Sequence, residues 1–131
     1  MLEMKETAFI CNNATPGSLI LLDELGRATS NEDGVSIAWA VSEFLLAKKS
    51  MTFFVTHYPQ LCWLSNAYPA VQNQHLKASI CSEGEGGIQY THKVGPGPYE
   101  DSPDYGVEMA TSCGWPLEVV QNVGVKRLFD S

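Results

Sequence analysis

The first part of the chain alternates between helix-like and strand-like patterns of apolar side chains. Residues 1–12 are predicted to be helical, because apolar side chains recur at the i, i+4, i+7 spacing of one face. That face is formed by Met4, Ala8 and Cys11. Residues 18–22 are almost wholly apolar, which is typical of a central strand covered by helices on both faces. Residues 51–55 form a second apolar and β-prone run.

A second helix is predicted between these two strands. Ser30 followed by Asp33 resembles a capping box that uses a shorter acid than usual. The basic residues 48–49 suit the carbonyl end of a helix. The order strand, helix, strand predicts a βαβ unit with parallel pairing. The apolar stripe of the helix is expected to be Ile37, Val41, Phe44 and Leu45.

The second half of the chain has a different pattern. Residues 71–80 and 88–94 flank a glycine-rich stretch, and residues 88–94 alternate between two faces, which predicts a β-hairpin with one wet face. Short helices are expected at residues 105–113 and 116–129. The predicted fold class is therefore α/β, with a parallel central sheet and flanking helices, followed by a β-hairpin and carboxyl-terminal helices.

Composition narrows the class of protein further. Of the 131 residues, 44% are hydrophobic, and the net charge is −7. No apolar run approaches the roughly 20 residues of a membrane span, so no membrane partner is expected. The acidic balance, without a basic cluster, repels the phosphate backbone of a nucleic acid, so these residues are not expected to form a nucleic-acid surface and DNA contacts must come from elsewhere. The four cysteines lack metal-site spacing, and reduced thiols are expected.

Three residues at predicted strand ends suggest chemistry. Asp23 and Glu24 end the first strand, and His57 follows the second. Ligands of open parallel sheets bind at the carboxyl ends of strands, so these side chains are expected to be neighbours. An aspartate there can hold Mg²⁺ through water, a glutamate can activate a water, and a histidine can donate to a terminal phosphate. Simple solvation at a strand end explains the acidic pair equally well when it is taken alone. A solvated position in a strand-to-helix turn explains His57 better than a site does, when that residue is taken alone.

Several segments, in this order, resemble the ATPase domain of the MutS-type mismatch-repair proteins. They are residues 1–4, 21–30, 33–34, 37–41, 54–58, 105–110 and 114–116. The resemblance covers almost the whole chain and implies an ABC-type P-loop NTPase fold. Residues 1–131 are accordingly interpreted as the carboxyl-terminal part of a MutS-type ATPase domain.

The resemblance also implies a role for each motif. Asp23 and Glu24 correspond to the Walker B pair, with Asp23 holding Mg²⁺ through water and Glu24 acting as catalytic base. His57 corresponds to the switch histidine near the γ-phosphate and is the second implied catalytic residue. The implied nucleotide-binding residues of the signature end and of the D-loop are Glu3, Met4, Gly26, Arg27, Thr29 and Ser30.

Cofactors and partners follow from the same resemblance. It implies ATP and Mg²⁺, and a second MutS-family subunit, identical or different, that the D-loop touches. DNA would be bound by domains outside this chain. The implied function is ATP use coupled to binding of mismatched or recombining DNA, in repair or in meiotic recombination. Residues between 64 and 76 and the loop 95–104 favour the eukaryotic meiotic branch, with a nuclear location, or a cytoplasmic one if the protein is not eukaryotic.

Two features depart from the family pattern. Ala28 stands where the family usually has glycine, so a backbone requirement there is either relaxed or unmet. No G-x-x-x-x-G-K-S/T phosphate loop occurs in the 131 residues. The resemblance therefore predicts an incomplete ATPase domain with its front missing, inactive by itself.

Two alternatives remain open. One is another ABC-type ATPase, such as a chromosome-maintenance or transporter protein. Transporters commonly place a proline-type turn after the acidic pair, where this chain has residues 25–27. The other is a non-catalytic dimerisation module from a truncated gene. The missing phosphate loop favours that module, whereas Asp23, Glu24 and His57 favour an ATPase.

Overall fold

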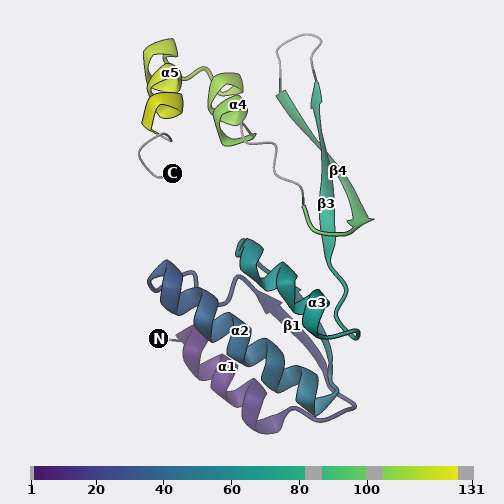
Figure 1. Cartoon of the computed structure of the whole chain (residues 1–131). Helices are drawn as coiled ribbons and strands as arrows, with labels where there is room; N and C mark the ends of the chain where they lie inside the picture. Colours follow the sequence, from purple (N-terminus) through teal and green to yellow (C-terminus); the bar gives the residue numbers. More distant parts are fainter. Residues whose placement is uncertain (1, 82–86, 100–104, 127–131) are drawn as a thin grey trace. The chain divides into compact units, whose positions relative to one another are not determined.

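The chain forms two compact units, Met1–Gln72 and Asn73–Ser131, and each is considered separately. The structure, a computed structural model, describes residues 2–81, 87–99 and 105–126 (Figure 1). Among these described residues, no helix is both long and apolar enough to cross a membrane.

The first unit is built around a βαβ arrangement. Its elements are α1 (Leu2–Asn13), β1 (Leu19–Asp23), α2 (Asn31–Lys48), β2 (Met51–Val55), the 3₁₀ helix η1 (Pro59–Trp63) and α3 (Leu64–Ala67). Strands β1 and β2 pair in parallel, from Leu19 opposite Met51 to Asp23 opposite Val55. The predicted mixed α/β class and the parallel pairing are therefore confirmed.

Helix α2 begins where the sequence predicts. The Ser30 hydroxyl oxygen accepts a hydrogen bond from the Asp33 backbone N–H at 3.2 Å, and its hydroxyl group lies 2.8 Å from Asp33 Oδ2, to which it donates. The carboxylate thus engages the Ser30 side chain, where a capping box would engage its backbone N–H. Lys49 caps the carboxyl end of the helix with a left-handed backbone conformation, at φ 58°.

The predicted apolar stripe of α2 is confirmed in part. Leu45 is buried and Val41 packs against the core, as predicted, whereas Phe44 is 43% exposed beneath the ammonium group of Lys48.

The predicted face of α1 is wrong. Thr7 is buried and Ile10 packs against the core, whereas Met4 and Ala8 are exposed. The α1 stripe was correct in spacing but displaced by about one residue. That displacement aims Glu3 along the same face as Thr7.

The core consists of two neighbouring clusters in which Phe54 of β2 takes part. One cluster holds α2 against the segment after β2, and it contains Ala38, Tyr58, Leu61 and Leu64. The other holds α1 and α2 against the sheet, and it contains Ile20, Leu22 and Leu45. Figure 1 shows α1 and α2 side by side along β1.

Within the described residues of the first unit, only one face of the sheet is covered. Ile20 and Leu22 are 6% and 7% exposed, but Leu19 and Leu21, on the opposite face of β1, are 66% and 71% exposed. The outward residues of β2, namely Met51, Phe53 and Val55, are 57–64% exposed. Coverage of both faces, which the apolar run of residues 18–22 predicted, is therefore not observed, since α1 and α2 pack on the same side. Strand β2 pairs with β1 alone among the described residues, so its other edge is unpaired there.

Residues 59–67, whose structure was not predicted, fold as η1 and α3. Pro59 occupies the first turn of η1, where the missing N–H of proline costs nothing. After α3, the Tyr68 hydroxyl donates a hydrogen bond to Glu43 Oε1 at 2.7 Å. That bond, burial and the negative charge of Glu43 all raise the pKa of Tyr68. The hydroxyl therefore stays protonated, and keeps this bond, at a higher pH than an ordinary tyrosine.

The second unit contains the predicted hairpin and helices. Strands β3 (Gln74–Cys81) and β4 (Gly87–Pro96) are antiparallel, with an irregular register between Leu76 and Ala78. Helices α4 (Tyr105–Ser112) and α5 (Leu117–Lys126) follow; the predicted end of the last helix, at residues 127–129, lies outside the described residues. Among the hairpin side chains that the structure describes, Leu76, Tyr90 and Val94 are 52–68% exposed, so the expected dry face is not found there.

Candidate functional site

The carboxyl ends of β1 and β2 lie side by side and bring the predicted site residues to one edge of the sheet. Asp23 is in register with Val55, and the Glu24 N–H donates to the Val55 carbonyl oxygen at 2.9 Å. Parallel pairing without an offset therefore places Glu24 next to the turn that carries His57. This is the edge at which α/β sheets bind ligands.

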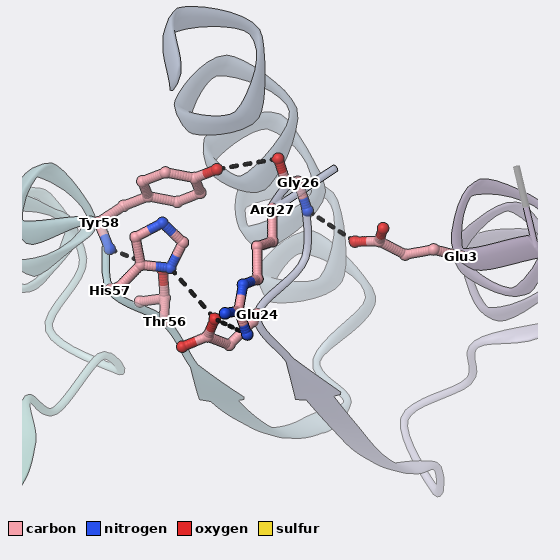
Figure 2. A network of polar contacts seen from close by, with 7 residues as sticks. All are labelled: Glu3, Glu24, Gly26, Arg27, Thr56, His57 and Tyr58. Atoms are coloured by element: carbon pink, nitrogen blue, oxygen red, sulfur yellow. Dashed lines mark hydrogen bonds and ion pairs between the residues drawn. The ribbon is translucent and has the colours of Figure 1, made fainter. Parts of the chain in front are cut away.

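Glu24 is the centre of a small charged cluster (Figure 2). Its Oε2 atom lies 3.4 Å from His57 Nδ1 and 3.3 Å from Arg27 Nη1. The Glu24 backbone is left-handed, with φ 52°, a conformation that side chains other than glycine, asparagine and aspartate seldom adopt. Such backbone strain is common at functional sites, because the surrounding structure must hold it.

His57 is presented on a turn fixed by its neighbours. Thr56 Oγ1 accepts a hydrogen bond from the Tyr58 N–H at 3.0 Å, and the His57 and Tyr58 rings lie 4.3 Å apart between centroids. The His57 side chain is 47% exposed. Its imidazole therefore contacts Glu24 while one side stays open to solvent or a ligand.

The loop after Glu24 is anchored at Gly26. The Gly26 N–H donates to Glu3 Oε1 at 2.7 Å, and the Tyr58 hydroxyl donates to the Gly26 carbonyl oxygen at 3.0 Å. Gly26 has φ 92°, and a Cβ atom there would lie 2.8 Å from the Cα atom of Gly34. Glycine is thus required at residue 26 both by its backbone conformation and by the close approach of α2.

The other predicted site residues lie near this cluster but do not join it. Asp23 is exposed, and its side chain makes no hydrogen bond or ion pair with the described residues. Met4 and Thr29 are exposed, and Ser30 caps α2. Ala28 is exposed, and its φ is not in the left-handed region, so its backbone conformation does not require glycine.

Metal ligands are sparse at this edge. In the part of the chain that the structure describes, no group of three or more His, Cys, Asp or Glu side chains could hold an ion. Asp23 offers one free carboxylate, which suits a cation that keeps most of its water shell, as Mg²⁺ does.

Two residues of the site, Tyr58 and Gly34, were not predicted as site residues from the sequence. A Cβ atom on Gly34 would collide with the Tyr58 hydroxyl. Gly34 lies inside a helix, where glycine costs ~1 kcal/mol relative to alanine and so calls for a packing reason. A glycine within a predicted helix was therefore the sequence feature that could have pointed to Gly34. No comparable signal marked Tyr58, because its partner is 32 residues away.

The chain matches known proteins over almost its full length. The family model described as MutS domain V matches residues 1–127. Proteins named DNA mismatch repair protein MutS are 45% identical over 123 residues in Halothermothrix orenii and 47% identical over 121 residues in Thermus thermophilus. Each alignment covers 92% of this chain, but the chain spans only 13% and 14% of those relatives. By this match the chain belongs to the MutS family and corresponds to its domain V.

Proposed function

We propose that this chain provides the hydrolytic edge of an ATP-binding domain in a MutS-family protein that acts in DNA mismatch repair. One observation carries the proposal: Glu24 and His57 face one another, 3.4 Å apart, at the carboxyl edge of a parallel strand pair. The names of the relatives support the repair context. Classification as an ABC-type P-loop NTPase is part of the same proposal.

The residues divide the chemistry among themselves. Glu24 orients the attacking water and takes up its proton, and His57 donates a hydrogen bond to the terminal phosphate. Asp23, exposed and without a partner among the described residues, would hold Mg²⁺ through water. Bound Mg²⁺ neutralises charge on the phosphates. The carboxylates at this edge repel a free nucleotide, so the phosphates need a cationic cradle that residues 1–131 do not contain.

A chimaera tests the proposal directly. Residues 1–127 replace the matching segment of the Thermus thermophilus protein, and ATP hydrolysis is measured beside the unmodified protein. The chimaera is expected to hydrolyse ATP, and the 131-residue polypeptide by itself is not. A folded chimaera that binds ATP without hydrolysing it would refute the assignment of this edge as the hydrolytic site.

A second subunit is the proposed partner, and the loop at residues 26–30 is its proposed contact. Arg27 supports this proposal, because its side chain is 77% exposed and its ion pair with Glu24 spans only one turn. Exposed ion pairs of this kind contribute about 0–1 kcal/mol to folding stability, so this pair gives Arg27 only a small role in stabilising the fold.

In the chimaera, Arg27→Ala is expected to weaken the dependence of one subunit's ATP hydrolysis on the other, with almost no change in melting temperature. Mixed dimers containing one hydrolysis-deficient subunit measure that dependence. Lys5→Ala, a change at an exposed cation of α1, is the matched control. A lower melting temperature with unchanged coupling would make Arg27 an ordinary surface residue.

A role in meiotic recombination, with a nuclear location, rests on the sequence resemblance alone and stays a prediction. DNA binding by other domains of the whole protein is likewise proposed from the family.

A further inference from the structure

Both peptide groups of Gly26 are hydrogen-bonded to side chains from distant parts of the sequence. Figure 2 shows Gly26 between Glu3 of α1 on one side and Tyr58 on the other. The Gly26 N–H donates to Glu3 Oε1 at 2.7 Å, and the Gly26 carbonyl oxygen accepts from the Tyr58 hydroxyl at 3.0 Å. The bond to the carboxylate is charge-assisted and hence stronger than a bond between neutral groups. The loop is therefore tied both to the start of α1 and to the residue after His57.

Steric contacts leave this arrangement little freedom. Tyr58 is 3% exposed and belongs to the buried cluster with Ala38 and Leu61. The Tyr58 hydroxyl passes next to Gly34 to reach Gly26. A Cβ atom on Gly34 would collide with that hydroxyl and would lie 2.8 Å from the Gly26 carbonyl oxygen. The packed ring thus fixes the hydroxyl, and the hydroxyl fixes the Gly26 peptide.

The clamped peptide lies next to the proposed reacting groups. The Arg27 N–H donates to the Glu24 carbonyl oxygen at 3.2 Å, so the turn that starts at Glu24 closes around Gly26. Tyr58 directly follows His57 in the chain. A displacement of Gly26 would therefore move Glu24 relative to His57. In the structure, Glu24 Oε2 lies 3.4 Å from His57 Nδ1.

We infer that Glu3 and Tyr58 are positioning residues that clamp Gly26 and thereby couple α1, the loop at residues 26–30 and the Glu24–His57 pair. The consequence for hydrolysis rests on the proposed function. Glu3 thus influences the reaction through its hydrogen bond to Gly26 of the same chain. This role is separate from the nucleotide contact that the family resemblance implies for Glu3. A shift of α1 is then passed to the loop and to Glu24.

Three variants in the chimaera test the clamp. Glu3→Ala removes the acceptor, and Tyr58→Phe removes only the hydroxyl of a buried ring. Glu3→Gln keeps a carbonyl oxygen that can accept from the Gly26 N–H. The matched controls are Glu6→Ala, at an exposed carboxylate of α1, and Tyr68→Phe, which removes a hydroxyl bonded at 2.7 Å to Glu43 away from the loop.

Two measurements separate positioning from plain stability. Hydrogen–deuterium exchange by mass spectrometry, on peptides that contain residues 26–30, is expected to accelerate about tenfold in Glu3→Ala and in Tyr58→Phe. The kcat for ATP hydrolysis is expected to fall about tenfold or more in the same variants, with KM within about twofold. Glu3→Gln is expected to restore most of both, and the two controls should change neither.

Each contrary result has a distinct meaning. Unchanged exchange in Glu3→Ala and Tyr58→Phe would show that the clamp does not hold the loop. Faster exchange with unchanged kcat would reduce the two residues to a structural role and overturn the inference. A parent chimaera without hydrolysis would refute the proposed function and, with it, the catalytic consequence, while the exchange data would still decide whether the clamp exists.

Discussion

In the chimaera, Glu24→Gln is expected to lower kcat for ATP hydrolysis by about 10²- to 10⁴-fold, the range typical of a lost general base. Nucleotide binding should be retained, because the amide keeps the size of the side chain. The backbone strain at φ 52° is the same for both residues. The substitution therefore removes the proton acceptor without removing the neighbours of the side chain.

Glu32→Gln is the matched control, since Glu32 is an exposed acid in the first turn of α2. It is expected to leave kcat unchanged. Steady-state kinetics, with nucleotide affinity measured separately, distinguishes loss of chemistry from loss of binding. Hydrolysis at the parental rate in Glu24→Gln would remove Glu24 from the mechanism.

The 131-residue polypeptide, expressed by itself, is expected to self-associate. The open sheet face carries five apolar side chains, each 57–71% exposed, and β2 has an unpaired edge among the described residues. They are Leu19, Leu21, Met51, Phe53 and Val55. An apolar and uncharged β edge without proline is the type that pairs with other chains. Light scattering with size-exclusion chromatography measures the association.

Phe53→Lys tests whether this face is responsible. Because Phe53 is 57% exposed, a lysine there costs little packing within the unit and places a charge on the face. Self-association is expected to decrease. Phe9→Lys, at a position of α1 that is 69% exposed, is the control and should leave association unchanged. A monomeric polypeptide that unfolds cooperatively would mean that the sheet face is covered.

Local pattern was enough to predict α1, β1, α2 and β2 of the first unit, although not η1 and α3. The β2 boundaries, residues 51–55, were predicted without error, because turn formers and a change of period mark them. Ser30 and Asp33 marked the start of α2, since capping depends on residues three apart. The acidic pair and His57 were correctly placed at one edge, because parallel strands joined by a helix align their carboxyl ends.

The sequence by itself thus determined the order and type of the four strands and of the longer helices, and the edge at which Asp23, Glu24 and His57 gather. Only the tertiary structure decided which face of α1 packs inward, that one face of the sheet is covered, and that Gly26 is held by Glu3 and Tyr58. The physical reason is distance along the chain. The clamp joins residues 23 and 32 positions apart, and such contacts depend on how whole elements pack, which no local spacing encodes.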